Sequence, residues 1–234
     1  MLEGTHQTAG KQIMNKYVVV IGAANIDIGG SPYYDLIKAD SNPGRISISY
    51  GGVGRNISDN LTRLGINVKL AAAVGNDALG RDLLESCRSC GIDTSCMFRD
   101  EDSTSSMYLY INNKDGDMAL ALSDVNIAEK VTPDYIDSIS DIINNAALVV
   151  MDCNLSQETC EHIMKICKVP LCIDPVSVTH ARKIKNKLNG VNVIKPNRLE
   201  AEFLTDIKIE SLEDYKKAAD VFFSQGVNKA FISM

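Results

Sequence analysis

GGVGRNISDNLTRLG, residues 51–65, places three glycines among four positions directly before a helical pattern. Apolar side chains then recur at the spacing of one helix face: Ile57, Leu61 and Leu64. Gly65 follows where a helix C-terminus often carries glycine. Because a turn needs a single glycine, three of them before Arg55 and Asn56 indicate a backbone that a ligand approaches closely.

Short apolar runs alternate with amphipathic helices on both sides of this stretch. Six runs each predict a buried strand: YVVVIG (17–22), VKLAAAVG (68–75), ALVVMD (147–152), VPLCID (169–174), VNVIKP (191–196) and KAFISM (229–234). Thr132 before Pro133 predicts a helix start, and Ser211 with Asp214 predicts a capping box for a helix that Gly226 closes. The alternation predicts an α/β fold with a mostly parallel sheet covered by helices on both faces.

Two segments have a different pattern. RISISY (45–50) and SSMYLYINNKDGDMALAL (105–122) alternate apolar and polar residues, and NKDG supplies hairpin turn chemistry. They predict a small, separate antiparallel sheet, the flap. Its apolar face needs covering by ligand, by the main domain or by a second subunit: Ile46, Ile48, Met107, Leu109 and Ile111.

The composition excludes several classes of protein. The chain has 234 residues, 45% of them hydrophobic and 23% charged, which is ordinary for one globular domain with an appendage. A net charge of -6 argues against nucleic-acid and membrane partners. Seven irregularly spaced cysteines indicate reduced thiols and a cytoplasmic protein. We expect residues 1–16 to be an N-terminal extension or tag remnant.

Asn25 and Asp27 follow the first predicted strand as the tripeptide NID. Ligands of open α/β sheets bind at the carboxyl ends of strands. A short carboxylate there can accept two hydrogen bonds from a vicinal diol, and an amide can donate and accept. An Asx-turn that ends the strand is the alternative interpretation.

The glycine stretch does not match a dinucleotide-binding pattern. Gly52 and Gly54 are followed by Ile57 where a third glycine belongs, and the stretch follows a flap strand rather than the first strand. A dehydrogenase is therefore disfavoured. Backbone N–H groups with the amide of Asn56 suit a polyol.

A further cluster follows the fifth predicted strand as KPNRLEAE (195–202). Asn197 and Glu200 share a helix face near its start, where Glu200 either complements the helix dipole or orients magnesium-bound water or phosphate. DCNLS (152–156) ends another strand at the same edge. Polar strand ends that converge on one edge predict a ligand site there.

These clusters, in this order, resemble the ribokinase-like (PfkB) family of carbohydrate and nucleoside kinases. GGVGRNISDNLTRLG, with Gly75 beyond it, is similar to the family's first signature. NID looks like its sugar-binding Asn-x-Asp, and PNRLE like its Asn-x-x-Glu motif for magnesium and phosphate. Within the family, ANID, ADSNPG, MDCNLS, DPVS and KPNRLEAE look most like the pseudouridine kinases.

The resemblance covers residues 17–234 and implies one PfkB kinase domain with a three-layer α/β/α fold. The flap, with strands within 30–50 and 95–122, then acts as a lid that pairs with the flap of a second subunit in a homodimer. The implied cofactors are ATP and Mg²⁺, and a monovalent cation is left open.

The resemblance also implies site residues. Substrate-binding roles fall on Asn25, Asp27, Gly51, Gly52, Arg55, Asn56, Asp152 and Asn154. Among these, Arg55 is expected to reach the base or an incoming phosphate. Nucleotide-side roles fall on Lys195, Asn197 and Glu200, with Glu200 acting on the metal through water. Base contacts are expected from Ser105, Ser106 and Tyr108 in the flap.

One family feature is missing from these residues. The family's catalytic base is an aspartate in a Gly-Ala-Gly-Asp stretch, and no such stretch occurs in the 234 residues. We expect the chain to be a fragment whose catalytic aspartate lies beyond Met234, so no catalytic residue is assigned within it.

The implied function is ATP-dependent phosphorylation of the primary hydroxyl of a ribosyl substrate. Pseudouridine, converted to pseudouridine 5′-phosphate, is the favoured acceptor. Two alternatives stay open at this point: a kinase for ribose, adenosine or another sugar, and a catalytically inactive protein that binds a nucleoside.

Overall fold

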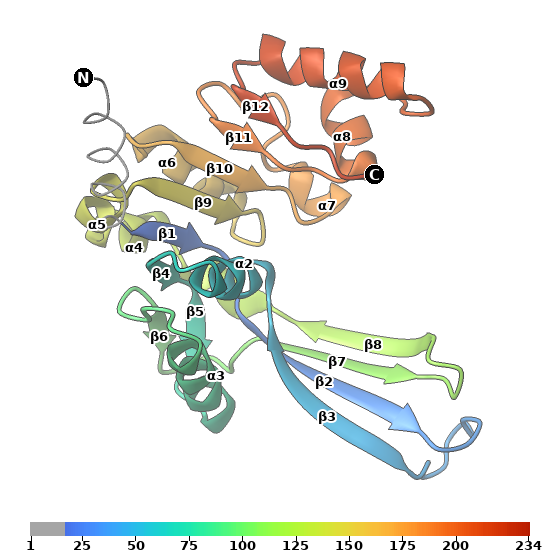
Figure 1. Ribbon diagram of the computed structural model, residues 1–234. Helices are drawn as coiled ribbons and strands as arrows, with labels where there is room; N and C mark the ends of the chain where they lie inside the picture. The colour runs from blue at the N-terminus through green and yellow to red at the C-terminus, as the bar shows by residue number, and fades with distance from the viewer. Residues whose placement is uncertain (1–16) are drawn as a thin grey trace, which may run out of the picture.

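The computed structural model describes residues 17–234, and the expected extension over residues 1–16 lies outside that range. Within it, the main sheet has six parallel strands in the order β12-β11-β10-β9-β1-β4. Its strands are β1 (Val18–Ile21), β4 (Val68–Ala71), β9 (Leu148–Asp152), β10 (Leu171–Asp174), β11 (Val193–Ile194) and β12 (Lys229–Ala230). Because all of them run in one direction, their carboxyl ends share one edge of the sheet (Figure 1).

The flat apolar runs predict a main sheet buried on both faces, and the structure meets this in part. β1 is buried on both faces, whereas one face of β9, β10 and β11 is only half-buried, at Leu148, Val150, Cys172 and Val193. Alternate residues of β1 pack into two different hydrophobic clusters: Val18 and Val20 into one, Val19 and Ile21 into the other. The first cluster contains side chains of α2 (Val53–Arg63) and α3 (Ala78–Ser89). The two helices therefore cover one face of the sheet.

Helices from the rest of the chain cover the opposite face (Figure 1). They are η1 (Asn126–Lys130, a 3-10 helix), α4 (Pro133–Ser138), α5 (Ser140–Asn144), α6 (Gln157–Ile166), α7 (Val178–Ala181), α8 (Arg198–Thr205) and α9 (Leu212–Ser224). The arrangement confirms the predicted three-layer α/β/α fold. Among residues 17–234, no helix is long and apolar enough to cross a bilayer.

The structure confirms the predicted helix ends. Their signals were readable in the sequence because each end depends on residues a few positions away. Thr132 Oγ1 accepts a hydrogen bond from Tyr135 N at the start of α4, with Pro133 in the first turn. Ser211 and Asp214 form a reciprocal capping box at the start of α9. Gly226, which follows α9, has φ 92°, a conformation that favours glycine.

Three strand predictions differ from the structure in extent. VNVIKP (191–196) forms only the two-residue β11. The run 68–75 is divided: β4 stays in the main sheet, whereas β5 (Ala73–Gly75) pairs with β6 (Phe98–Asp100). The division falls at Ala72, whose carbonyl accepts from Phe98 N. KAFISM forms only the two-residue β12, followed by an isolated bridge to Asn197.

The flap is a four-stranded sheet in the order β3-β2-β7-β8 that projects from the main body (Figure 1). Its strands are β2 (Asn25–Pro32), β3 (Gly44–Gly51), β7 (Met107–Asn112) and β8 (Met118–Asp124). The β2–β3 and β7–β8 pairs are antiparallel, as predicted for the flap, and β2 pairs with β7 in parallel. The tripeptide NID is thus the start of a flap strand rather than a loop after β1.

The strand register gives the flap two chemically different faces. Asp27 lies beside Ser49 on β3 and Tyr108 on β7, which makes one face polar. Ile28 lies beside Ile48 and Leu109, which makes the other face apolar. The polar face carries the carboxylate predicted to bind a sugar.

Candidate functional site

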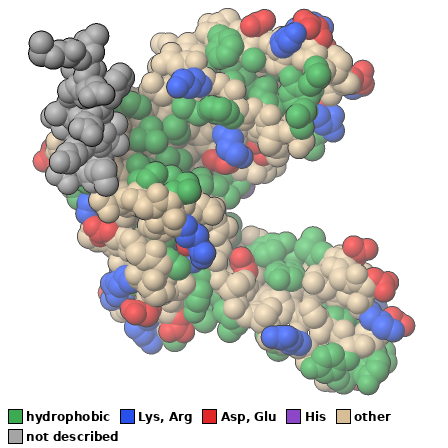
Figure 2. Space-filling model, in the orientation of Figure 1, with side chains coloured by type: hydrophobic (Ala, Val, Ile, Leu, Met, Phe, Trp, Pro, Cys, Tyr) green, Lys and Arg blue, Asp and Glu red, His purple; other side chains and the backbone are tan. Residues whose placement is uncertain are grey.

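The carboxyl ends of the main-sheet strands and the base of the flap border a broad hollow. In Figure 1 the arrowheads of β1, β9 and β10 point toward it. Figure 2 shows the hollow between the flap and the part of the molecule built from β9–β12 and α7–α9. Ligands of open α/β sheets bind at this kind of edge.

Asn25 starts β2 at the base of the flap, and Ser106 fixes it there. The Ser106 hydroxyl donates to Asn25 Oδ1 at 2.8 Å, and Ile26 N donates to Ser106 O at 2.9 Å. Ser106, which was expected to contact a base, is itself 5% exposed. It orients the Asn25 amide so that its Nδ2 donor remains for a ligand.

Asp27 lies two residues further along the same face. Its carboxylate is half-buried, and burial raises its pKa. Within residues 17–234 no hydrogen bond is recorded to either carboxylate oxygen, and burial alone accounts for the pKa shift. A carboxylate that has lost part of its hydration without gaining a protein donor is prepared to accept hydrogen bonds from a ligand.

The glycine stretch lies directly against this carboxylate. A Cβ on Gly51 would stand 2.2 Å from Asp27 Oδ2. Gly52 has φ 91°, and a Cβ there would stand 2.6 Å from Ala23 O. Glycine at both positions therefore has a steric reason: the backbone passes between the Asp27 side chain and the turn after β1.

Asn56 lies in the first turn of α2, where its N–H donates to Gly52 O and its side chain is exposed. The structure thus brings Asp27 and the start of α2 together through Gly51, as the predicted polyol site requires. The helix α2 (Val53–Arg63) confirms the helix predicted after the glycines.

Arg55 differs from its expected role. The predicted contact with a base or phosphate requires an accessible guanidinium, but Arg55 is 9% exposed and turned toward α2 and α3. Its Nη1 lies 3.2 Å from Asp59 Oδ2, and its Nη2 lies 3.5 Å from Cys90 Sγ. The ion pair with Asp59 holds the side chain against α2, and the same Nη1 donates to Asn56 Oδ1 at 3.4 Å. In this structure Arg55 packs α2 and reaches the predicted site through Asn56.

The two strand-end residues after β9 occupy different environments. Asp152 is fully buried, which removes it from direct contact with a ligand in the hollow, contrary to the expectation. Asn154 is half-buried, and its Nδ2 donates to Asp152 Oδ1 at 2.9 Å. Lys183 Nζ donates to the carbonyls on either side of Asn154, at 2.9 Å to Cys153 O and 2.6 Å to Leu155 O. Asn154 therefore lies in a turn that Lys183 stabilises through these two hydrogen bonds.

Asn197 and Glu200 form a reciprocal capping box at the start of α8. Asn197 N and Nδ2 donate to the Glu200 carboxylate at 2.8 and 2.7 Å, and Glu200 N donates to Asn197 Oδ1 at 2.9 Å. Glu200 is 3% exposed, and burial raises its pKa. Asn197 and Glu200 therefore cap α8, which is the local role predicted for Glu200 as an alternative to binding magnesium-bound water or phosphate.

Asp174 is a neighbour of this pair that the sequence analysis did not identify. It ends β10, and its charge contributes to the raised pKa of Glu200. Lys195 Nζ lies 3.9 Å from Asp174 Oδ2 and is largely exposed, so its charge faces solvent near the two carboxylates. The position of Asp174 at the end of a parallel strand was the sequence signal that could have identified it.

Tyr110 is another neighbour of the site that was not predicted. A Cβ on Gly29 would stand 2.5 Å from Tyr110 Oη, so the ring lies across Gly29 on the polar face, two residues from Asp27. The period-two pattern of β7 places Tyr108 and Tyr110 on one face. Only the β2–β7 register shows that this face is the one with Asp27.

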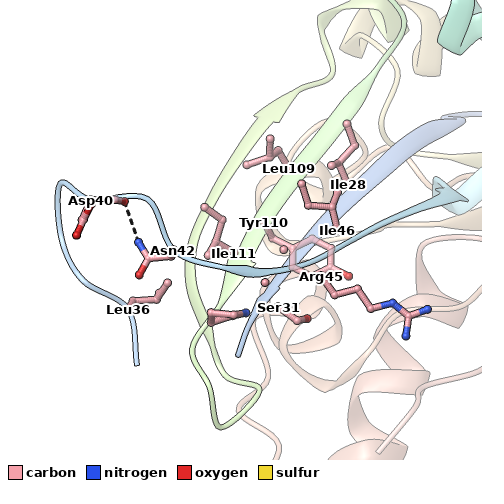
Figure 3. Close-up of a pocket in the computed structure, with 13 residues that line it drawn as sticks. Ile28, Ser31, Leu36, Asp40, Asn42, Arg45, Ile46, Leu109, Tyr110 and Ile111 are labelled. Carbon is pink, nitrogen blue, oxygen red and sulfur yellow. Dashed lines mark hydrogen bonds between the residues drawn. The ribbon is translucent and has the colours of Figure 1, made fainter. Parts of the chain in front are cut away.

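The apolar face of the flap has a pocket of its own (Figure 3). Its cavity of about 370 Å³ lies between the sheet and the segment 33–43, where Asn42 Nδ2 donates to Asp40 O at 3.0 Å. Ile28, Ile46 and Leu109 point into it from three strands. The pocket lies on the face opposite Asp27, so it is distinct from the predicted sugar site.

Comparisons with known proteins agree with this geometry. The family model described as pfkB family carbohydrate kinase matches residues 15–234. The chain is 40% identical over 220 residues to pseudouridine kinase of Escherichia coli (strain K12), which covers 93% of this chain and 70% of that protein. It is 36% identical over 218 residues to the sugar kinase YeiI of the same organism, of which it spans 60%.

A solved carbohydrate kinase from Agrobacterium tumefaciens has a similar fold. It superposes with a TM-score of 0.84 at 26% identity, over 93% of this chain and 70% of that one. The likeness therefore extends over most of the chain.

Proposed function

The chain belongs to the pfkB family of carbohydrate kinases, and from that premise we propose that it binds a ribosyl acceptor for phosphorylation of its primary hydroxyl by ATP. Pseudouridine is the acceptor we favour. The 40% identity to a pseudouridine kinase supports this choice.

The observation that carries the proposal is the environment of Asp27. Its carboxylate is half-buried, carries no recorded hydrogen bond within residues 17–234, and lies against Gly51. Two vicinal hydroxyls of a ribose supply two donors for its two oxygens. Asn25 Nδ2, oriented by Ser106, adds a donor on the same face.

The proposed contribution of these residues to phosphoryl transfer is positioning. Transfer to a hydroxyl depends mainly on alignment and on stabilisation of charge. Asp27 and Asn25 hold the ribose ring by its secondary hydroxyls, and Gly51 lies against the Asp27 carboxylate on the same side. Gly52 and Asn56 form the opposite wall. The primary hydroxyl is then left free to face the strand ends of the main sheet, where Asn154 lies.

The residues on the nucleotide side fit a metal bound through water. Both Glu200 oxygens already accept from Asn197, so their remaining lone pairs suit a metal-bound water better than direct coordination. Lys195 offers a positive charge to a phosphate beside them. ATP with Mg²⁺ supplies the transferred phosphoryl group when bound. No residue of this chain is assigned to removal of the hydroxyl proton.

We propose further that the apolar face of the flap is covered by the same face of a second copy. Several of its side chains are exposed, Ile46 to 76% and Leu122 to 65%. One row of side chains crosses the four strands of the flap: Ile48, Ile28, Leu109 and Leu122. A face dominated by aliphatic side chains can meet its own copy and bury apolar surface on both sides.

Isothermal titration calorimetry on the 234-residue chain tests the acceptor. Pseudouridine, uridine, adenosine and D-ribose are compared, together with 2′-deoxyuridine, which lacks one of the two diol hydroxyls. We expect pseudouridine to bind with the highest affinity. We expect the affinity for 2′-deoxyuridine to be roughly tenfold lower than that for uridine, because part of the Asp27 interaction is left unmade. Tighter binding of ribose or adenosine would instead support the alternative kinases.

Asp27→Ala tests the site itself, with Asp115→Ala as matched control at the exposed β7–β8 turn. Loss of pseudouridine binding in Asp27→Ala alone supports the proposal. Equal affinity of both variants and the unmodified chain would refute it. A catalytically inactive nucleoside-binding protein gives the same binding data, and an assay of phosphoryl transfer on the native gene product separates it from a kinase.

A further inference from the structure

Asp152 is a buried carboxylate that the proposed ligand contacts leave unused. It is the last residue of β9, which lies between β1 and β10 in the main sheet. The side chain has no exposure to solvent. Buried carboxylates are costly unless hydrogen bonds compensate the lost hydration, so the partners of Asp152 show what it does.

The partners are backbone and amide N–H groups from two turns. Asp152 Oδ2 accepts from Ala23 N at 2.9 Å, across 129 residues of chain. Asp152 Oδ1 accepts from Asn154 N and Asn154 Nδ2, both at 2.9 Å. The Gly54 N–H, in the first turn of α2, also stabilises the carboxylate. The carboxylate thus connects the turn after β1, the turn after β9 and the N-terminus of α2.

Two glycines make room for this arrangement. A Cβ on Gly22 would stand 2.1 Å from Asp152 Oδ2. A Cβ on Gly54 would stand 3.1 Å from the same atom and 3.2 Å from Ala23 N. The absence of side chains at both positions allows the backbone to approach the carboxylate.

Both backbone polar groups of Ala23 are held by hydrogen bonds. Its N–H donates to Asp152, and its C=O accepts from Arg55 N at 3.0 Å in α2. Asn25 follows two residues later, and Gly51 and Gly52 precede α2. The connection therefore ties together the two segments that form the opposite walls of the proposed sugar site.

We propose that Asp152 is a positioning residue: it holds the turn Gly22–Ala24 against the start of α2 and so sets the distance between the two walls of the acceptor site. This inference rests on the proposed function. Asp152 contacts no ligand, because its oxygens are buried and occupied. It also supplies an internal anion to the N-terminus of α2, which reduces the attraction of that helix end for a ligand phosphate.

Asp152→Asn is the test variant because it keeps the shape and removes the charge. One of its two oxygen positions becomes an NH₂ group, which cannot accept from Ala23 N or from Asn154. We expect pseudouridine and D-ribose to lose affinity by a similar factor, roughly tenfold, because the walls that hold the sugar move apart. Thr159→Val is the control. Its buried hydroxyl donates to Val131 O, so its loss lowers stability without touching the site.

Amide hydrogen exchange supplies a readout that loss of stability alone does not reproduce. In Asp152→Asn we expect faster exchange at Ala23, Gly54 and Asn154, and unchanged exchange in β10. In Thr159→Val we expect no selective change at these amides. Uniform acceleration over the whole sheet, or affinity equal to that of the unmodified chain, would overturn the inference.

The two proposals fail separately. If the unmodified chain binds neither pseudouridine nor ribose, the proposed function is wrong, while the exchange pattern still tests the connection through Asp152. If the unmodified chain binds both and Asp152→Asn binds them equally well, the positioning role is wrong and the acceptor site stands.

Discussion

The Asp27 carboxylate lies directly over the α-carbon of Gly51: a Cβ at that position would stand 2.2 Å from Asp27 Oδ2. The two residues lie on adjacent strands of the flap, β2 and β3, and Gly51 leads into the N-terminus of α2. The proposed sugar ligand is thereby placed between the flap and the first helix, and the glycine is a condition of that placement.

Gly51→Ala is therefore expected to weaken acceptor binding without unfolding the chain. Gly51 does not have positive φ, so the new methyl group strains the site chiefly by pushing the flexible end of Asp27 aside. We expect pseudouridine affinity to fall by roughly tenfold, the scale of one misplaced charge-assisted contact. Calorimetry measures the affinity, and thermal unfolding checks the fold.

Gly30→Ala is the matched control for this substitution. It lies on the neighbouring flap strand β2, and its Cβ would have no neighbour closer than 3.6 Å. Equal loss of affinity in both glycine variants would show that the flap tolerates no side chain at all, and the Asp27 explanation would fail.

Asp152 predicts a pH dependence of stability. Burial raises its pKa to about 6, above the ordinary 3.8. At pH values between 3.8 and about 6, the folded chain binds a proton that the unfolded chain does not. This group therefore makes folding more favourable as pH falls from about 7 to 4. Its contribution is lost as pH rises through about 6. The full difference is of the order of 3 kcal/mol in the free energy of unfolding.

Urea unfolding of the chain and of Asp152→Asn at pH 7 and pH 5 measures this effect. Asp27 and Glu200 also have raised pKa values and shift stability in the same direction, and Cys153 beside Asp152 has a raised pKa that keeps it neutral. The comparison with Asp152→Asn isolates the Asp152 contribution. If the stability gap between the two proteins is the same at both pH values, Asp152 does not titrate in this range.

Arg55→Ala is expected to act on stability. The substitution removes the partially buried ion pair with Asp59 and leaves Asp59 with Arg63, which lies 2.8 Å away. We expect the free energy of unfolding to fall by roughly 2 kcal/mol, below the loss for an isolated buried pair because Arg63 remains. Pseudouridine affinity, measured by calorimetry on the folded variant, should change less than threefold. A loss of affinity as large as that of Asp27→Ala would return Arg55 to the ligand site.

Ile46→Asp tests the pairing of two flaps. A carboxylate in the middle of the apolar face places two like charges in the proposed dimer interface and costs their desolvation. We expect sedimentation equilibrium to show a dimer for the unmodified chain and a monomer for Ile46→Asp. Lys114→Glu, at the exposed β7–β8 turn, should remain dimeric. A monomeric unmodified chain would contradict the pairing directly.

Much of the fold follows from the sequence because its signals are local. Apolar runs such as ALVVMD predict a strand buried on both faces, and the strand β9 appears where predicted. Thr132 and Ser211 cap their helices through residues three positions away, a range that a sequence shows directly. The alternation in RISISY likewise predicts a half-exposed strand of the flap.

The candidate site was predictable only in part. NID and the glycine stretch indicate which residues lie near a ligand, and the structure places Asp27 against Gly51. The direction of Arg55 was not predictable, because a helix residue faces ligand or core according to how the helix packs on α3. The parallel β2–β7 pair, which brings Tyr110 across Gly29, joins segments far apart in the chain.

By itself the sequence determined the order and type of the elements, their capping residues and the chemistry available at the strand ends, since each depends on residues within one or two turns of the chain. Only the tertiary structure decided which of those polar groups stay accessible. Asp152 and Asp27 are both strand-associated carboxylates, yet one accepts from Ala23 N across 129 residues and is buried, while the other is half-buried and accepts no hydrogen bond within residues 17–234. The difference comes from which backbone N–H groups the fold brings within reach, and contacts so distant in sequence form only when the sheets assemble.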